Sequence, residues 1–358
     1  MAYTGVNKST NFFNTLLYSG NGSTNSITGV NFQPDWTWIK TRNLSGYNHN
    51  VYDAVRGVTK LLKPSGTNAE ITSATSLTAF DSDGFSFGGT GTGEINQSNG
   101  TYASWNWKAN GQGSSNTDGS INTTYTSVNN TAGFSISSYT GTGANATIGT
   151  GLTSKPACVI IKNLTDGGTE WMIGHQGLAT NAFSSNKYIH FNTATTSTNS
   201  SSWNSTEPTS NGIVSLGNGS YLNGSGKNYI CYAFTETPGF SKFSDYIGNA
   251  NADGPFLYCG FKPAFIILKN TVDGAKNWEM LDNKRPSTGQ NPADDLLFPD
   301  TVDAESTSQT DRLVDFVSNG IKIRGNSAQM NGNGQKFIFM AFAAAPIVGT
   351  NDIPANAR

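Results

Sequence analysis

The third part of the chain carries the densest group of carboxylates, the side chains that polysaccharide-cleaving enzymes use in pairs. Glycoside cleavage needs two carboxyl groups about 5 to 10 Å apart, and carboxylate oxygens can also hold Ca²⁺. This run lacks the alternating spacing of a dedicated calcium loop, and the two earlier copies of the repeat described below have no such run. We therefore interpret it as a solvated acidic loop. Its members are Asp294, Asp295, Asp300, Asp303, Glu305, Asp311 and Asp315.

Side chains for nucleophilic or metal chemistry are few. No Gly-x-Ser-x-Gly nucleophile turn accompanies any of the three histidines. Cys158 and Cys231 fall in predicted core strands, where a free cysteine packs as a small apolar residue. The glycine-rich run 88–93 lacks the Gly-Lys-Ser/Thr ending of a phosphate loop. We therefore predict no catalytic, cofactor-binding or metal-binding residue, and no enzyme activity. The histidines are His49, His175 and His190.

Aromatic rings offer a different chemistry, because sugars pack on aromatic faces and bond to neutral amides and hydroxyls. Most tryptophans of the first third fall in predicted core strands, so packing explains them. Trp203 lies instead in a run of serines and asparagines, and it is the candidate surface contact. The core tryptophans are Trp36, Trp38, Trp105 and Trp107.

The composition excludes several classes of partner. The 358 residues carry a net charge of −2 with a pI near 5.9, so nothing attracts the chain to nucleic acid. No apolar stretch approaches the roughly 18 residues of a membrane span. The first ten residues lack the basic and apolar segments of a secretory signal. We expect neither membrane insertion nor a bound cofactor.

One segment occurs three times: a proline, an apolar run of strand length (the anchor strand) and a lysine. A turn glycine follows the proline by 50, 56 and 57 residues, and a closing strand ends on an aromatic residue 23, 22 and 22 residues later. In each copy an opening strand with a glycine-rich loop comes before the anchor strand. We expect each lysine to lay its stem on apolar surface and its head in water. The prolines are Pro34, Pro156 and Pro263; the lysines are Lys40, Lys162 and Lys269; the closing aromatics are Trp107, Phe234 and Phe342.

These landmarks predict an all-β protein of three tandem β-sandwich modules with one jelly-roll-like topology. Each copy yields six to eight short strands over roughly 100 residues, which is typical of a sandwich. In the second and third copies the closing strand is apolar at nearly every position, so we expect it to be buried on both faces or central in a packed sheet. The predicted boundaries are modules 1–110, 133–236 and 237–346, a flexible linker or long loop at 111–132, and a tail at 347–358.

Nearly the whole chain, and the first module most closely, resembles repeated modules in tail-fibre and other appendage proteins of marine bacteriophages, including viruses of cyanobacteria. In the second and third copies His175 and Asp282 occupy the position of Asp53. The Arg56-Gly57 pair has no clear equivalent in those copies. The resemblance implies a virion location and host-surface contact, and it supplies no catalytic residue. The similar segments are 17–24, 29–40, 52–57, 80–85, 105–108 and 353–358.

The sequence and the resemblance together predict a structural virion protein, a tail fibre or related external appendage that contacts a host receptor or surface glycan. The alternatives are an array of carbohydrate-binding modules and a polysaccharide-degrading tail spike. Expected partners are other tail or capsid proteins. Low charge and open sheet edges further favour a homo-oligomer, a trimer above all. The chain would be made in the bacterial cytoplasm before it joins the virion.

Overall fold

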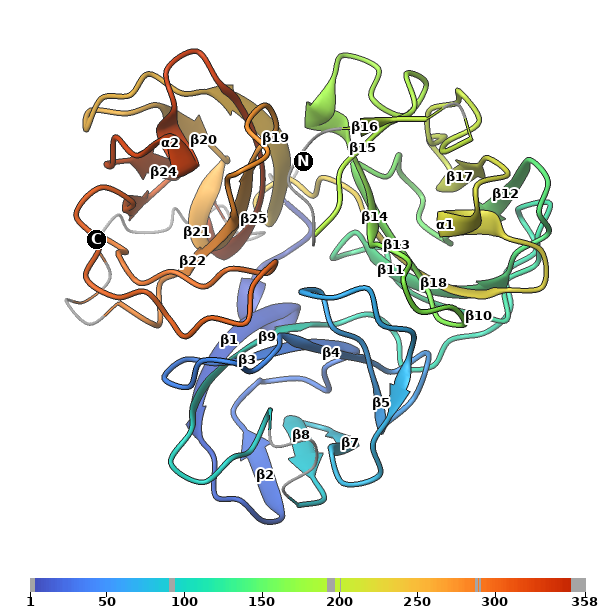
Figure 1. The fold of residues 1–358 in the computed structure, drawn as a ribbon, viewed down its shortest axis with the longest axis horizontal. Helices are drawn as coiled ribbons and strands as arrows, with labels where there is room; N and C mark the ends of the chain where they lie inside the picture. Colours follow the sequence, from blue (N-terminus) through green and yellow to red (C-terminus); the bar gives the residue numbers. More distant parts are fainter. Residues whose placement is uncertain are drawn as a thin grey trace.

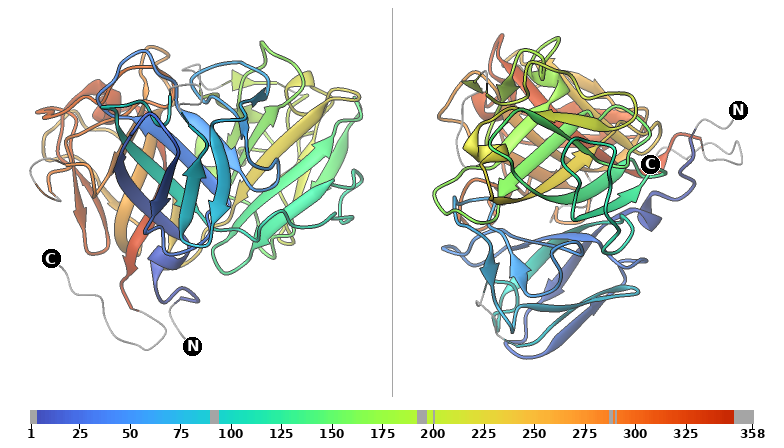
Figure 2. Two further views of the ribbon diagram at one scale, coloured as in Figure 1. Left: turned by 90° about the horizontal axis from the view of Figure 1, so that it is seen from below. Right: turned by 90° about the vertical axis from the view of Figure 1, so that its right-hand side faces the viewer.

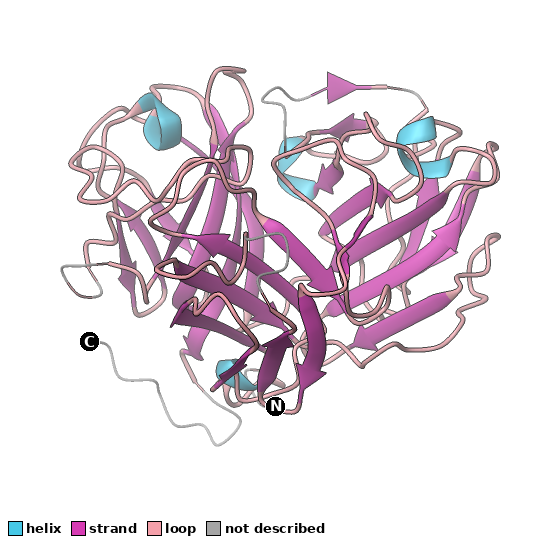
Figure 3. Cartoon of the chain, turned by 60° about the horizontal axis from the view of Figure 1, so that its bottom comes forward, coloured by secondary structure: helices cyan, strands magenta, loops and turns pink. Residues whose placement is uncertain are grey.

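The computed structural model describes residues 4–89, 94–191, 197–199, 201–286, 289 and 291–348. Strands dominate these residues (Figure 3), and their helical turns span three or four residues each. The predicted all-β fold class is confirmed. The predicted tail from residue 349 onward and the similar segment 353–358 lie outside the described residues. The helical turns are η1 (Ser9–Asn11), η2 (Gln176–Leu178), α1 (Ser220–Asn223) and α2 (Ala328–Asn331).

Three main antiparallel sheets have the same strand order. In each of them the opening strand pairs with the closing strand, which pairs with the anchor strand, which pairs with the next strand in sequence. The first sheet is β1 (Phe13–Ser19), β9 (Thr101–Trp107), β3 (Trp36–Thr41) and β4 (Asn50–Asp53). The second begins with an additional edge strand, β10 (Tyr125–Asn129), followed by β11 (Phe134–Thr140), β18 (Asn228–Phe234), β13 (Cys158–Asn163) and β14 (Met172–His175). The third is β19 (Ser241–Ile247), β25 (Lys336–Pro346), β21 (Phe261–Asn270) and β22 (Trp278–Asp282).

Each main sheet is accompanied by a smaller one. The first is β2 (Asn25–Thr28), β8 (Gly84–Phe87) and β7 (Leu77–Asp81); the second is β12 (Ala146–Gly149) and β17 (Ile213–Leu216); the third is β20 (Phe256–Tyr258), β24 (Gly320–Ile323) and β23 (Val314–Val317). Two short hairpins, β5 (Lys60–Leu61) with β6 (Ile71–Thr72) and β15 (Lys187–Tyr188) with β16 (Ser197–Thr198), complete the strands described. Ile27 and Phe85 of the first small sheet share a buried cluster with Ile39 and Tyr102 of the first main sheet. The two sheets therefore pack as a sandwich.

The sheets form three lobes around a common centre (Figure 1). We call them the first lobe (β1 to β9), the second lobe (β10 to β18) and the third lobe (β19 to β25). The side views show the lobes packed against one another rather than strung out in a row (Figure 2). One apolar cluster contains residues of all three lobes. The boundaries of separate modules stay a prediction, because the lobes share this core.

The centre of the molecule is a close-packed apolar contact of the three main sheets. The space left there is about 10 Å³, too small for a ligand. Trp36 of the first lobe stacks on Tyr232 of the second at 4.8 Å between ring centroids. Phe13 of the first lobe stacks on Phe342 of the third at 5.2 Å. The residues that line the central space are Trp36, Trp38, Trp107, Ile160, Phe234, Phe265, Ile267, Met340 and Phe342.

This arrangement explains why the closing strands are buried on both faces. Successive side chains of a strand point to opposite sides of its sheet. In β9, Tyr102 belongs to the core of the first lobe's own sandwich, whereas Trp105 and Trp107 belong to the shared central core. All residues of β9 and β18 except the first are buried. The burial on both faces predicted for the closing strand of the second copy, β18, is confirmed, and β9 is buried in the same way.

The predicted linker contributes to the second lobe. Within 111–132, strand β10 (Tyr125–Asn129) pairs with β11 and covers its outer edge. Hydroxyl side chains form hydrogen bonds within the rest of the segment. For example, Ser115 Oγ donates to the carbonyl of Thr123 at 2.7 Å. Strand pairing and side-chain hydrogen bonds therefore tie this segment to the second lobe.

Candidate functional site: the polar contacts between lobes

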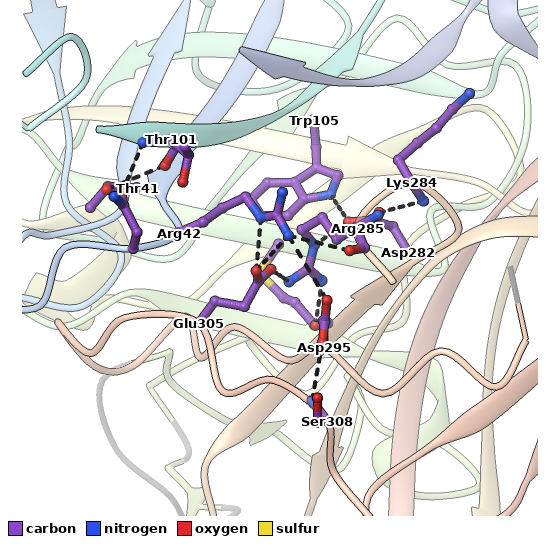
Figure 4. Close-up of polar contacts among 12 residues, drawn as sticks. Thr41, Arg42, Thr101, Trp105, Asp282, Lys284, Arg285, Asp295, Glu305 and Ser308 are labelled. Atoms are coloured by element: carbon purple, nitrogen blue, oxygen red, sulfur yellow. Dashed lines mark hydrogen bonds and ion pairs between the residues drawn. The ribbon is translucent and has the colours of Figure 1, made fainter. Parts of the chain in front are cut away.

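The most elaborate polar cluster joins the third lobe to the first (Figure 4). Asp282 ends β22 and is buried. Its carboxylate accepts hydrogen bonds from Nε of Arg285 at 2.6 Å and from the backbone N–H of Arg285 at 3.0 Å. The indole N–H of Trp105, in the first lobe, donates to the same carboxylate at 3.0 Å. A buried charge is thereby paired and its oxygens are satisfied.

The acidic run supplies the next part of this cluster. Glu305 accepts from Arg285 at 2.7 Å and from Nε of Arg42, in the first lobe, at 2.8 Å. Asp295 lies 3.9 Å from the Arg42 guanidinium and accepts from the backbone N–H of Ser308 at 3.2 Å. Burial raises the pKa of the Asp295 carboxyl.

The interpretation of the run as a solvated acidic loop was therefore wrong for its central members. The exposed fraction of the side chain is 1% for Asp295 and 4% for Glu305. Arg42 and Arg285 neutralise these carboxylates, and the sequence separates Arg42 from them by more than 250 positions. Asp303 and Asp311 are exposed as expected.

The contact between the first and second lobes repeats this arrangement. Asp53 ends β4 and binds Nε of Arg56 at 2.5 Å. The hydroxyl of Tyr232, in the second lobe, donates to Asp53 at 2.7 Å. Glu70 lies 3.4 Å from the Arg56 guanidinium. It is the counterpart of Glu305, which lies beside Arg285 in the other contact. Tyr232 and Trp105 occupy the same position in their closing strands, two residues before the last aromatic.

A histidine takes the place of the ion pair between the second and third lobes. His175 ends β14, and its Nδ1 accepts from the backbone N–H of Gly177 at 3.0 Å. Nε2 therefore carries the proton and faces the carbonyl of Phe339, in the third lobe, at 3.2 Å. Burial lowers the pKa of His175 to about 4, so the ring is neutral near pH 7. The three contacts link first to second, second to third and third to first lobe, which closes a ring.

Most of the charged side chains at these contacts between lobes are closed off from solvent. A general acid or base must reach the substrate and exchange a proton with it. Asp53, Asp282 and Arg285 are fully or almost fully buried, and arginine holds both carboxylates. Across the part of the chain that the structure describes, no three His, Cys, Asp or Glu side chains are grouped so as to hold a metal ion.

The three repeated lysines correct another expectation. Lys40, Lys162 and Lys269 are fully buried, so their heads do not reach water. Each ammonium donates to the backbone carbonyl of the residue seven positions later, as Lys40 does to Tyr47 at 2.7 Å. Burial lowers the pKa of each lysine to about 8. All three lysines thus provide a hydrogen-bond donor for a backbone carbonyl in the loop that follows the anchor strand.

Trp203 does not lie where the sequence placed it. Its side chain is fully buried, packs on Phe183 at 5.1 Å between centroids, and donates its N–H to the carbonyl of Lys187 at 2.9 Å. The prediction of a surface contact was wrong, because the polar run around Trp203 folds over the ring. Cys158 and Cys231 are buried and free, as predicted for core packing, and burial raises the pKa of both thiols.

Sequence reasoning missed Arg285 as the counterpart of Arg56. Both arginines follow an aspartate by three positions, in Asp53-Ala54-Val55-Arg56 and Asp282-Asn283-Lys284-Arg285. That shared spacing was a usable signal. The pairing of Arg42 with Glu305 had none, because it depends on how the first and third lobes meet.

One structural finding and two comparisons with known proteins bear on identity. No helix among the described residues is both long and apolar enough to cross a membrane. No curated protein matches the chain. A family model matches residues 8–346, which include every strand of the three lobes, and the chain therefore belongs to the family defined by the domain of unknown function DUF7483.

Proposed function

We propose that this chain is a non-enzymatic structural protein of a bacteriophage virion, a tail fibre or related external appendage that contacts the host surface. The virion location rests on the resemblance of the first module, above all 29–40 and 52–57, to phage appendage modules. One structural observation carries the non-enzymatic role: the most densely charged buried clusters are used to join lobes. In each cluster an arginine and an aromatic side chain of the neighbouring lobe both bind the buried aspartate.

A polysaccharide-degrading spike is less well supported. Its acid and base would come from the acidic run, whose buried members Asp295 and Glu305 face Arg42. Both carboxylates are buried and lie against arginine, so neither is open to a substrate. A carbohydrate-binding role has support of its own, which is given below.

Assembly into a homotrimer remains part of the proposal. The outer edges of β1 and β19 pair with no other described strand, whereas β10 covers the corresponding edge of β11. Unpaired edges invite contact with other chains. Light scattering of the purified protein should give a mass near three times the 38.0 kDa of one chain. A mass near 38.0 kDa at micromolar concentration would leave assembly to other virion proteins.

The virion location can be tested on a phage that encodes the chain. Gradient-purified particles should contain the protein by mass spectrometry, at a fixed ratio to the major capsid protein. Antibody-gold labelling should decorate the tail or another external position. Detection in infected-cell lysate but not in purified particles would overturn the proposal.

A further inference from the structure

Two aromatic rings stand in solvent on the outer face of β20, in the third lobe. Phe256 is 46% exposed and Tyr258 is 58% exposed, whereas Leu257 between them is buried. The alternation follows from the strand, which turns Leu257 to the lobe's core and its two neighbours outward. These are the two most exposed aromatic side chains among the described residues.

The neighbouring strand places a glycine beneath one of the two rings. Tyr258 pairs with Gly320 of β24, and Phe256 pairs with Lys322. A Cβ atom at Gly320 would lie only 2.8 Å from the Phe256 ring, so that ring lies across the glycine. Val317 of β23 pairs with Gly320 on its other side. The face therefore presents two rings and a partly buried aliphatic side chain, with the buried glycine beneath the Phe256 ring.

Charged groups at the rim of this face are balanced. Lys322 binds Asp253 at 2.6 Å, and Arg324 binds Asp315 at 3.3 Å. Each cation has its own carboxylate, so the rim gives no advantage to an anionic or a cationic ligand. The same groups can still exchange charge-assisted hydrogen bonds with hydroxyls. A neutral ligand with an apolar face and a hydroxylated edge matches this surface.

The fold does not require the two rings. In the first lobe, Gly84 of β8 pairs with Thr28 of β2 as Gly320 pairs with Tyr258. The position equivalent to Phe256 is Ser26, whose hydroxyl lies 2.8 Å from that of Ser86. The same small sheet is thus built with small polar residues, which leaves the exposed aromatic pair without a structural reason.

We propose that the β20–β24–β23 face binds a neutral pyranose of a surface polysaccharide. The sugar's C–H face packs on Phe256 and Tyr258, and its hydroxyls bond to Lys322, Asp253 and Asp315. The inference deepens the host-surface contact of the proposed function and is testable on the isolated protein. Its failure would leave the virion location untouched, because that rests on purified particles.

The test is titration calorimetry with neutral gluco-, galacto- and manno-configured hexasaccharides, with tetragalacturonate as the charged comparison. The key variant carries Phe256→Ser and Tyr258→Thr, the residues of the first lobe at the same positions. Val272→Ser, which changes another exposed apolar side chain of the third lobe, is the matched control. An unchanged Tm in each variant establishes that the fold persists.

The wild type and the control should bind at least one neutral hexasaccharide, and the double variant should bind it at least tenfold more weakly. Three results would overturn the proposal: no binding of any neutral sugar, equal binding by the double variant, or binding of tetragalacturonate alone. Self-association that the double variant abolishes, without sugar binding, would assign the face to a second copy of the chain instead.

Discussion

The indole nitrogen of Trp105 lies 3.0 Å from Oδ2 of Asp282, although 177 positions separate the two residues. At the equivalent contact, the hydroxyl of Tyr232 lies 2.7 Å from Oδ2 of Asp53. Two different aromatic donors thus serve the same acceptor geometry. The aspartate that ends the strand after the anchor strand is bound both by its own arginine and by the next lobe.

Loss of the Asp282 charge should destabilise the protein strongly. Asp282→Asn leaves the buried guanidinium of Arg285 with only Glu305 as an acidic partner. Breaking a buried ion pair typically costs about 3 to 5 kcal/mol, and urea unfolding measures it. Asp166→Asn, at the exposed pair with Lys227, is the control and should change stability little. A loss at Asp282 no larger than that of the control would contradict the interlobe role.

Trp107 tests the shared core. Trp107→Ala removes a ring that packs on Phe13, Trp36 and Phe342, from two different lobes. Large-to-small changes at such sites cost about 3 to 5 kcal/mol. Val272→Ala, at a side chain that is 60% exposed, is the matched control. A change within about 0.5 kcal/mol, the range of surface substitutions, would mean that Trp107 does not support the core.

Glu279 gives a prediction on pH. Burial raises its pKa to about 8, although Arg312 lies nearby. Between pH 4.5 and 8 the folded state therefore holds a proton that the unfolded state has released, so stability falls as the pH rises. Glu279→Gln should remove this decline, and its advantage over the wild type should grow from pH 5 to pH 8. A stability difference independent of pH would contradict the raised pKa.

Metal and nucleotide should not affect stability. A ligand that binds the folded state stabilises it by mass action, so its removal lowers the melting temperature. Scanning with EDTA or with added ATP should leave Tm unchanged. A drop of several degrees in EDTA would show that a bound metal had been stabilising the fold, and the run from Asp294 to Asp315 would be examined first.

Strand pattern and repeat spacing predicted the fold class and the inner positions. The closing aromatics Trp107, Phe234 and Phe342 were predicted to be equivalent, and all three line the central space. This succeeded because alternation within a strand and the distance between landmarks are local properties of the chain.

The contacts between lobes could not be predicted in the same way. A lysine at a strand end usually reaches water, but Lys40 is covered by Val302 of the third lobe, whose carbonyl lies 3.4 Å from its Nζ. Likewise, the sequence around Glu305 suggests a solvated acid, because its partner Arg42 belongs to the first lobe. Burial that comes from the meeting of distant segments leaves no periodic signal in either segment.

The central claim is that three lobes form one closed unit, and differential scanning calorimetry tests it most directly. The wild type should unfold in a single transition, with calorimetric and van't Hoff enthalpies in agreement. Asp53→Asn, at the contact of the first and second lobes, should lower that single transition as a whole. Two or three resolved transitions, of which Asp53→Asn moves only one, would contradict the claim.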